Sequence, residues 1–150
     1  MPSTISLVKQ LKLDYPAIQF KEGEVFSWSP STSTIYYKIE GSAQDLIHEL
    51  AHAVLSHTDY RRDIELVAME RDAWEKALTH LGPTYGIDLS RDVIEESMDS
   101  YRDWLHARST CPNCQATGLE SDKHLYFCPA CRSNWTVNEA RTCGLRRLKT

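Results

Sequence analysis

An apolar ten-residue run that carries two histidines and a glutamate constrains this 150-residue chain more than any other feature. The run, residues 46–55, reads Leu-Ile-His-Glu-Leu-Ala-His-Ala-Val-Leu. Its apolar side chains cover nearly the whole circumference of a helix, which predicts a helix buried in a core. His48 and His52 are four residues apart, so they project from one face of that helix. Buried polar side chains need hydrogen-bond partners or a metal ion, because burying them without either is costly.

The spacing of His48, Glu49 and His52 allows both imidazoles to bind one cation, with the glutamate beside it. This spacing is typical of zinc metallopeptidases, in which the glutamate is the general base that acts on a metal-bound water. The alternative is a surface helix that carries the pattern by chance, which the surrounding apolar residues disfavour. We therefore expect His48 and His52 to bind zinc and Glu49 to be the catalytic base.

A zinc ion held by two histidines needs a third protein ligand if one position is to stay open. The next predicted helix, about residues 61–81, offers several carboxylates. At about 100° per residue, Glu70 falls in the middle of the apolar arc of this helix, whereas Glu65, Asp72 and Glu75 fall outside its centre. A carboxylate that points into a core must be paired or must bind metal. Glu70 is therefore the predicted third ligand, and a buried salt bridge to an arginine is the alternative.

His57 is the competing ligand. On a helix that continues to about residue 57, its side chain points about 140° away from that of His52. We therefore expect His57 to be a capping or surface residue.

The motif His48-Glu-Leu-Ala-His followed by Glu70-Arg-Asp-Ala-Trp-Glu-Lys-Ala resembles the ImmA/IrrE family of gluzincin-like zinc peptidases. In that family, HExxH on one helix is completed by a glutamate that begins an ExxA-type motif on the next. The resemblance covers about residues 20–80 and implies cleavage of a protein partner, typically a regulator. SprT-like proteases, which join HExxH to a C-terminal zinc ribbon, are a weaker resemblance. Their third ligand is a downstream histidine, and no histidine occurs here between His57 and His80.

Two CPxC motifs, Cys111-Pro-Asn-Cys114 and Cys128-Pro-Ala-Cys131, are separated by 13 residues. This spacing is typical of a zinc ribbon, in which four thiolates form a closed tetrahedral structural site. Disulfides and redox-active pairs are the alternatives, and the absence of a secretory signal disfavours stable disulfides. We expect a structural zinc at these four cysteines and leave the role of Cys143 unassigned.

Hydrophobic periodicity predicts an α+β fold. Helices are expected over residues 3–13, from about 42 to 57, 61 to 81 and 90 to 108, and strands within residues 17–21, 24–29 and 34–39. The strands are expected to form a small antiparallel sheet packed on the helices that carry HExxH and Glu70. An exposed edge of the strand over 34–39 is the candidate for pairing with an extended substrate. We assign residues 1–108 to a metallopeptidase-like domain and residues 109–150 to a zinc ribbon and basic tail.

Charge is distributed unevenly along the chain. Residues 1–108 carry 11 Lys+Arg and 18 Asp+Glu, a net charge of −7, whereas residues 109–150 carry 6 and 3, a net charge of +3. An acidic body is a poor general nucleic-acid binder, but the basic ribbon and tail could contact phosphates. No apolar run is long enough to span a membrane and no secretory signal is present, so we expect a cytoplasmic protein without a membrane partner.

Together these features predict zinc-dependent hydrolysis of a peptide bond in a protein substrate, with one catalytic and one structural zinc. The catalytic zinc would lower the pKa of its water towards about 7, and Glu49 would take the proton. The alternative is a non-enzymatic, metal-stabilised binding module that recognises nucleic acid or a protein through the ribbon.

Overall fold

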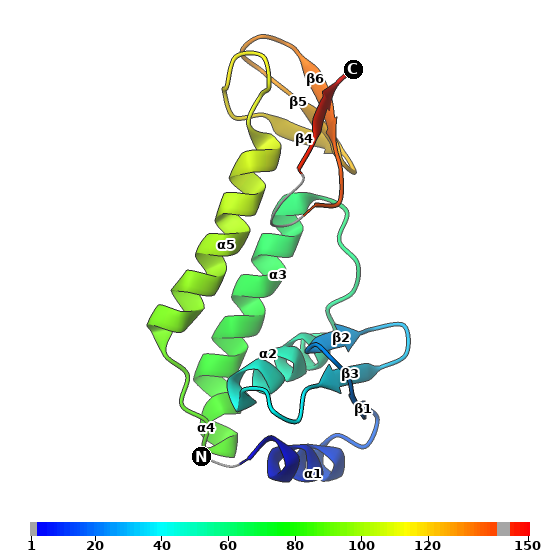
Figure 1. Ribbon diagram of the computed structural model, residues 1–150, viewed down its shortest axis with the longest axis vertical. Coiled ribbons are helices and arrows are strands. Elements are labelled where there is room, and N and C mark those ends of the chain that lie inside the picture. Colours follow the sequence, from blue (N-terminus) through cyan, green and yellow to red (C-terminus); the bar gives the residue numbers. More distant parts are fainter. Residues whose placement is uncertain (1–2, 141–144) are drawn as a thin grey trace. The chain divides into compact units, whose positions relative to one another are not determined.

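The computed structural model describes residues 3–140 and 145–150, which form two compact units (Figure 1). The first unit comprises the chain up to Thr58 together with Met69–Ile94, and the second comprises Asp59–Ala68 together with the chain from Glu95 onward. The second unit therefore begins earlier in the chain than the predicted domain boundary at residue 108. Within the described ranges, no helix combines the length and the apolar character that crossing a bilayer requires.

The first unit contains helices and a small sheet, which confirms the predicted α+β class. Ser3 and Ser42 cap the first two helices, because each side chain accepts a hydrogen bond from a backbone N–H of the first turn. The elements, in chain order, are α1 (Thr4–Asp14), β1 (Gln19–Glu22), β2 (Ser27–Ser29), β3 (Thr34–Tyr37), α2 (Ala43–Val54), α3 (Asp63–Lys76), the π-helical turn η1 (Ala77–Leu81), α4 (Gly82–Tyr85) and α5 (Arg91–Ser109). The first residues of α3 and most of α5 belong to the second unit.

The sheet of the first unit is mixed, so the expectation of a purely antiparallel sheet is wrong for one of its two pairings. Its strand order is β1-β3-β2, with β2 antiparallel and β1 parallel to β3. The strand β3 is central because its first two residues, Thr34 and Ile35, are completely buried. Since both edges of β3 are paired, it has no free edge for a substrate, and the edge strands of this sheet are β1 and β2.

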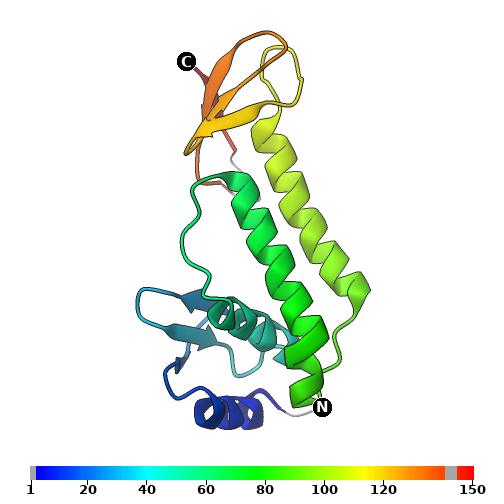
Figure 2. The ribbon, with the colours of Figure 1, turned by 180° about the vertical axis from the view of Figure 1, so that it is seen from behind.

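The helix α2 is the buried element of the first unit, as its apolar sequence predicts. Leu46, Ile47, Leu50 and Ala51 have no exposed surface. They join α1, β1, β3 and η1 in a single apolar core, and α2 lies against β2, β3 and η1 (Figure 2). Burial of this helix on nearly every side places its histidines and Glu49 beside other elements instead of in bulk solvent.

The helical segment that begins with α3 continues past Gly82-Pro83, where the sequence predicted its end. Pro83 lies in the first turn of α4, directly after the π-helical turn η1, where the regular α-helical hydrogen-bond pattern is already interrupted. The segment instead ends at Gly86, whose left-handed backbone (φ 68°) is the usual glycine cap.

The second unit carries a four-stranded antiparallel sheet in the order β4-β5-β6-β7. Its strands are β4 (Leu119–Asp122), β5 (Leu125–Phe127), β6 (Asn134–Val137) and β7 (Arg147–Lys149). Tyr126 and Trp135 stack at 5.6 Å between ring centroids and are almost fully buried with Cys111 and Cys128. The last strand, β7, lies within the segment that the sequence described only as a basic tail.

A buried ion pair joins the start of α3 to the end of α5 within the second unit. Asp63 has no exposed surface, and its Oδ2 accepts hydrogen bonds from Arg108 Nε at 2.8 Å and from the Tyr126 hydroxyl at 2.6 Å. Arg108 is 1% exposed and also lies 4.8 Å above the Trp104 ring. Burial, together with the hydrogen bond to Asp63, raises the pKa of Tyr126, so Tyr126 keeps the proton that it donates to Asp63.

The substitution Asp63→Ala should destabilise the second unit by about 3–5 kcal/mol, because it leaves the buried Arg108 cation without its counter-ion. Urea unfolding followed by circular dichroism measures the change. The control is Asp99→Ala, which removes an exposed partner of Arg102 and should cost at most about 1 kcal/mol. Equal, small effects of the two substitutions would contradict the assignment.

Candidate metal centres

Three donor atoms from two helices converge in the first unit. His48 Nε2 lies 2.9 Å from Glu70 Oε2, and His52 Nε2 lies 3.1 Å from Glu70 Oε1. The two histidine Nε2 atoms are 3.1 Å apart. All three side chains are about 7% exposed, so the structure brings together, in a buried position, the three metal ligands that the sequence predicted.

This donor set fits a tetrahedral cation such as zinc. Two ligands at 2.0–2.1 Å from a tetrahedral zinc are separated by about 3.3 Å, close to the distances among these three side chains. Two neutral imidazoles and one carboxylate would form a site with one remaining position, which is the ligand number of catalytic zinc sites. The three side chains can therefore hold one metal ion without rearrangement of either helix.

The position of Glu70 follows from its place on α3. Ala73 and Ala77, one and two turns further along, are fully buried, and η1 contacts α2 directly. Burial by itself raises the pKa of Glu70, but the hydrogen bonds and charges of His48 and His52 outweigh burial and lower the pKa to about 2. Glu70 is therefore an anion at neutral pH.

Glu49, the predicted general base, lies next to the candidate ligand His48 on α2 and is half-buried. Burial is the main cause that raises the pKa of its carboxyl, and the neighbouring Glu70 adds to the rise. His48, His52 and the backbone N–H of Trp28 in β2 oppose that rise. The Glu49 carboxyl is therefore within electrostatic reach of all three candidate ligands and accepts a hydrogen bond from the backbone of β2.

The indole of Trp74 holds the ring of His48. The two rings stack at 3.9 Å between centroids with an interplanar angle of 22°. Among the described residues, His48 Nδ1 is buried without a hydrogen-bond partner. The orientation of His48 therefore depends on ring packing. In the sequence, Trp74 stands out as part of the motif that begins at Glu70.

The prediction that His57 points away from His52 is wrong, because α2 ends before His57. Val54 is the last helical residue, and Ser56 has a left-handed backbone with φ 56°. Such a backbone costs a non-glycine residue about 1–2 kcal/mol, and it reverses the chain. His57 Nδ1 consequently lies 2.8 Å from His52 Nδ1, a contact that helical spacing did not reveal.

The four ribbon cysteines form the second candidate centre, and their ligand atoms lie within 4.8 Å of one another. The Cys111 and Cys131 sulfurs are 3.6 Å apart, and those of Cys114 and Cys128 are 3.5 Å apart. None of the four forms a disulfide. Four cysteine sulfurs this close together are the donor set of a closed structural zinc site. Cys143 lies outside the described residues.

The two CPxC motifs adopt the same local structure. In each motif the residue after the second cysteine has a left-handed backbone, φ 67° at Gln115 and φ 64° at Arg132. Its N–H donates to the carbonyl of the first cysteine, at 2.9 Å and 2.8 Å respectively. Each turn also directs the backbone N–H of the second cysteine towards the sulfur of the first. Backbone donors aimed at sulfur favour thiolate ligands.

Contacts from Ser133 and Asn113 reinforce this preference at Cys131. The Ser133 hydroxyl lies 3.2 Å from the Cys131 sulfur, and the Asn113 side-chain amide donates to it at 3.5 Å. These contacts, led by Ser133, lower the pKa of Cys131 to about 5. Cys131 can therefore enter a metal site already deprotonated.

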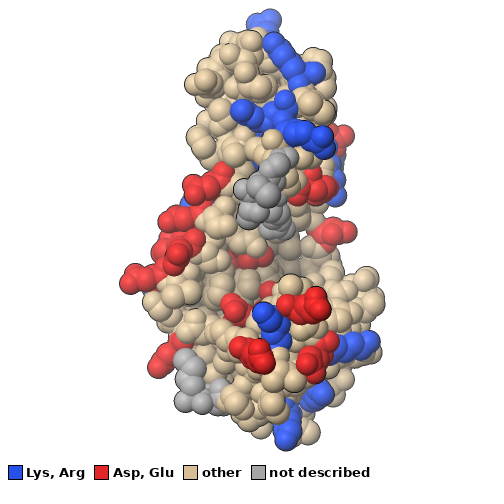
Figure 3. All heavy atoms as spheres, viewed as in Figure 1, with Lys and Arg blue, Asp and Glu red and all other residues tan. Residues whose placement is uncertain are grey.

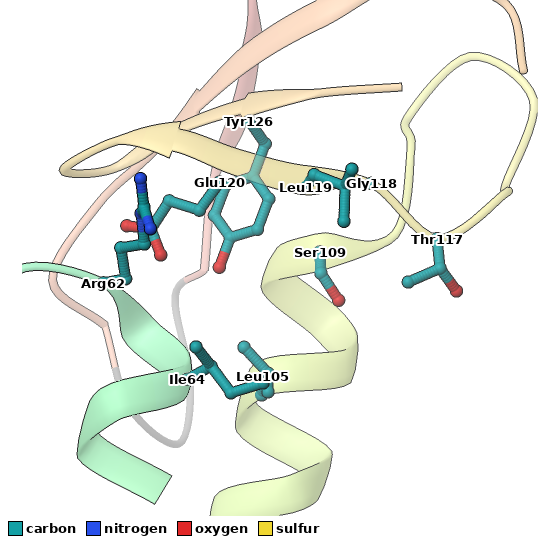
Figure 4. Close-up of a pocket in the computed structure, with 9 residues that line it drawn as sticks. All are labelled: Arg62, Ile64, Leu105, Ser109, Thr117, Gly118, Leu119, Glu120 and Tyr126. Carbon is teal, nitrogen blue, oxygen red and sulfur yellow. The ribbon is translucent and has the colours of Figure 1, made fainter. Parts of the chain in front are cut away.

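A pocket of about 360 Å³ in the second unit involves neither metal centre. Ile64 of α3 and Leu105 of α5 point towards one another at its base, below Tyr126 and Leu119 (Figure 4). Its lining contains none of the seven candidate ligands. This pocket is thus separate from both candidate metal centres.

Comparison of the chain with protein-family models, with curated proteins and with solved structures found no match. The assignment of these centres therefore depends on their own geometry.

The substitution Glu70→Ala should lower the metal content of the purified chain from two ions to one, because it removes the anionic donor of the first centre. Elemental analysis after dialysis measures the change, and the control Asp72→Ala alters an exposed carboxylate on the same helix. Retention of two ions by Glu70→Ala would mean that another side chain completes the site.

Proposed function

We propose that this chain is a zinc-dependent peptidase whose catalytic zinc binds to His48, His52 and Glu70. The observation that carries the proposal is the convergence of two imidazoles and a carboxylate from neighbouring helices. The glutamate of HExxH, Glu49, lies directly beside them. A structural zinc at the four cysteines completes the proposed metal content.

A zinc ion in this site would supply Lewis-acid activation of a water molecule and of the substrate carbonyl. Glu49 then acts as the general base: its carboxylate takes a proton from the attacking water and later transfers that proton to the leaving amine. The burial that raises the pKa of Glu49 favours this role, because a more basic carboxylate takes up a proton more readily. His48, His52 and Glu70 keep their places throughout the cycle.

An extended peptide can approach the site along β2. This strand lies at the edge of its sheet, and the backbone N–H of Trp28 faces Glu49. Addition of the substrate to a free strand edge would align the peptide by backbone hydrogen bonds. The resemblance of residues 20–80 to ImmA/IrrE peptidases supports a protein, such as a regulator, as the substrate.

The substitution Glu49→Gln should leave the metal content unchanged and lower hydrolysis by at least about 100-fold, since an amide of the same shape cannot accept the proton. The zinc-loaded chain is incubated with a library of peptides, and cleavage products are read by mass spectrometry. Glu75→Gln, an exposed change in the first unit, is the control. Undiminished cleavage by Glu49→Gln would exclude Glu49 as the base.

A second candidate function, binding of nucleic acid by the ribbon, is favoured by the basic character of β7. Every residue of β7 is exposed, including Arg147 and Lys149, and Arg146 precedes it. Lys and Arg side chains gather over this part of the molecule in Figure 3. Exposed cations beside one another can neutralise successive phosphates of a nucleic-acid backbone.

Combined replacement of Arg146 and Lys149 by alanine should weaken binding to duplex DNA and lower the salt dependence of that binding. Each lost phosphate contact reduces the slope of log K against log salt by about 0.9. Fluorescence anisotropy with labelled duplex DNA, measured over a range of salt concentrations, gives the slope. The control replaces two lysines of the first unit, Lys12 and Lys21. An unchanged slope would exclude the ribbon as the binding surface.

A further inference from the structure

The end of α2 gives each ring nitrogen of His52 a separate partner. His52 Nε2 faces Glu70 and His48, whereas Nδ1 faces His57 Nδ1 at 2.8 Å. The rings of His52 and His57 meet edge-on, with centroids 5.1 Å apart and an interplanar angle of 61°. His57 is not one of the three proposed ligands, and its contact with His52 has no part in the proton transfers assigned to Glu49.

The backbone holds His57 in this position from two sides. The N–H of Ser56 donates to the carbonyl of Ala53 at 3.1 Å, and the N–H of His57 donates to the carbonyl of His52 at 3.0 Å. This pair of hydrogen bonds is a Schellman motif, here with serine in the left-handed position. From β2, Trp28 Nε1 donates to the His57 carbonyl at 2.9 Å. The segment Ser56–His57 therefore folds back against the end of α2, and Trp28 of β2 holds it there.

A ligand histidine must keep its proton on the nitrogen that does not bind metal. If His52 binds a cation through Nε2, its Nδ1 carries the proton and is the donor towards His57. His57 Nδ1 is then the acceptor, and the His57 proton resides on Nε2. One hydrogen bond between two neutral rings thereby selects the tautomer of His52 and the plane of its ring.

In the part of the chain that the structure describes, His48, the other candidate imidazole ligand, has no hydrogen bond like the one between His52 and His57. Its ring is held by stacking on Trp74 at 3.9 Å, and its Nδ1 has no hydrogen-bond partner among the described residues. Among the described residues, therefore, only His52 of the two candidate imidazole ligands has a side-chain hydrogen-bond partner at Nδ1. Loss of that bond should be detectable as a loss of metal affinity.

We propose that His57 is a positioning residue that accepts a hydrogen bond from His52 Nδ1 and so prepares His52 Nε2 to bind the metal ion. The inference rests on the metal site of the proposed function but not on peptide hydrolysis. His57 itself binds neither metal nor substrate.

Zinc affinity tests this role in the full chain. The chain is titrated with zinc in competition with a chromophoric chelator, so that the four-cysteine centre and the His48–His52–Glu70 centre are measured separately. His57→Leu, which fills the space without an acceptor, should weaken zinc binding at the histidine centre by about 10- to 100-fold. His57→Asn places an oxygen at the same distance from the backbone as Nδ1, and it should keep the affinity close to that of the unchanged chain. Zinc binding at the cysteine centre should not change in either variant.

The control is His80→Leu, which removes an exposed histidine of the same unit and should leave both affinities unchanged. Thermal unfolding of each variant verifies that it is folded. A second measurement needs no variant: in the zinc-loaded unchanged chain, the Nδ1 proton of His52 should be visible by NMR and protected from exchange with water. In folded His57→Leu that protection should be lost.

Two results would overturn the proposal: an unchanged zinc affinity in folded His57→Leu, or a His52 ring proton in the unchanged chain that exchanges as fast as an exposed one. Neither result affects the Glu49 experiment. Conversely, absence of peptide cleavage by the unchanged chain would overturn the proposed function and leave the affinity ratios, and therefore the role of His57, intact.

Discussion

The ionised carboxylate of Glu70, buried between two imidazole rings, is the interaction on which the candidate metal centre depends. A buried charge is costly unless it is paired, and the two histidines provide that compensation. They can do so only if α2 and α3 approach closely, which the buried alanines Ala73 and Ala77 permit. The same convergence that stabilises the anion creates a site with the donor types and the spacing that zinc requires. Core packing and metal binding thus both require that α2 and α3 approach each other closely.

The helix α3 satisfies two buried carboxylates in different ways. Asp63 and Glu70 are seven residues apart, so both side chains lie on the same side of the helix. Asp63 is paired with Arg108 and Tyr126 in the second unit, and Glu70 with histidines in the first. The two outcomes that the sequence offered for a core-facing carboxylate therefore both find a counterpart on this helix: a salt bridge at Asp63 and a candidate metal site at Glu70. The angular argument that identified Glu70 also applies to Asp63, although only the tertiary partners distinguish the two roles.

The two candidate histidine ligands are each held by one neighbouring residue, and the sequence predicts only one of these two contacts. Trp74 lies one helical turn beyond Glu70, and it belongs to the apolar stripe that helical periodicity detects. The contact of His57 depends instead on the left-handed backbone of Ser56. Residue preferences do not predict this conformation, because the residue that usually adopts it at a helix end is glycine. A helix one turn longer would place His57 on the far side of α2. A single backbone conformation at Ser56 decides between these arrangements.

The sequence by itself determined the features that depend on short separations along the chain. The spacing of His48, Glu49 and His52 places them on one helix, the apolar arc selects Glu70, and the two CPxC motifs specify a four-sulfur cluster. Each of these follows from local geometry that neighbouring residues share. Only the tertiary structure decided the parallel pairing of β1 with β3, the addition of β7 to the ribbon, the pairing of Asp63 with Arg108 and the contact of His57 with His52. These depend on which distant segments compete for the same buried edge, counter-ion or hydrogen bond, and that competition is settled by packing of the whole chain.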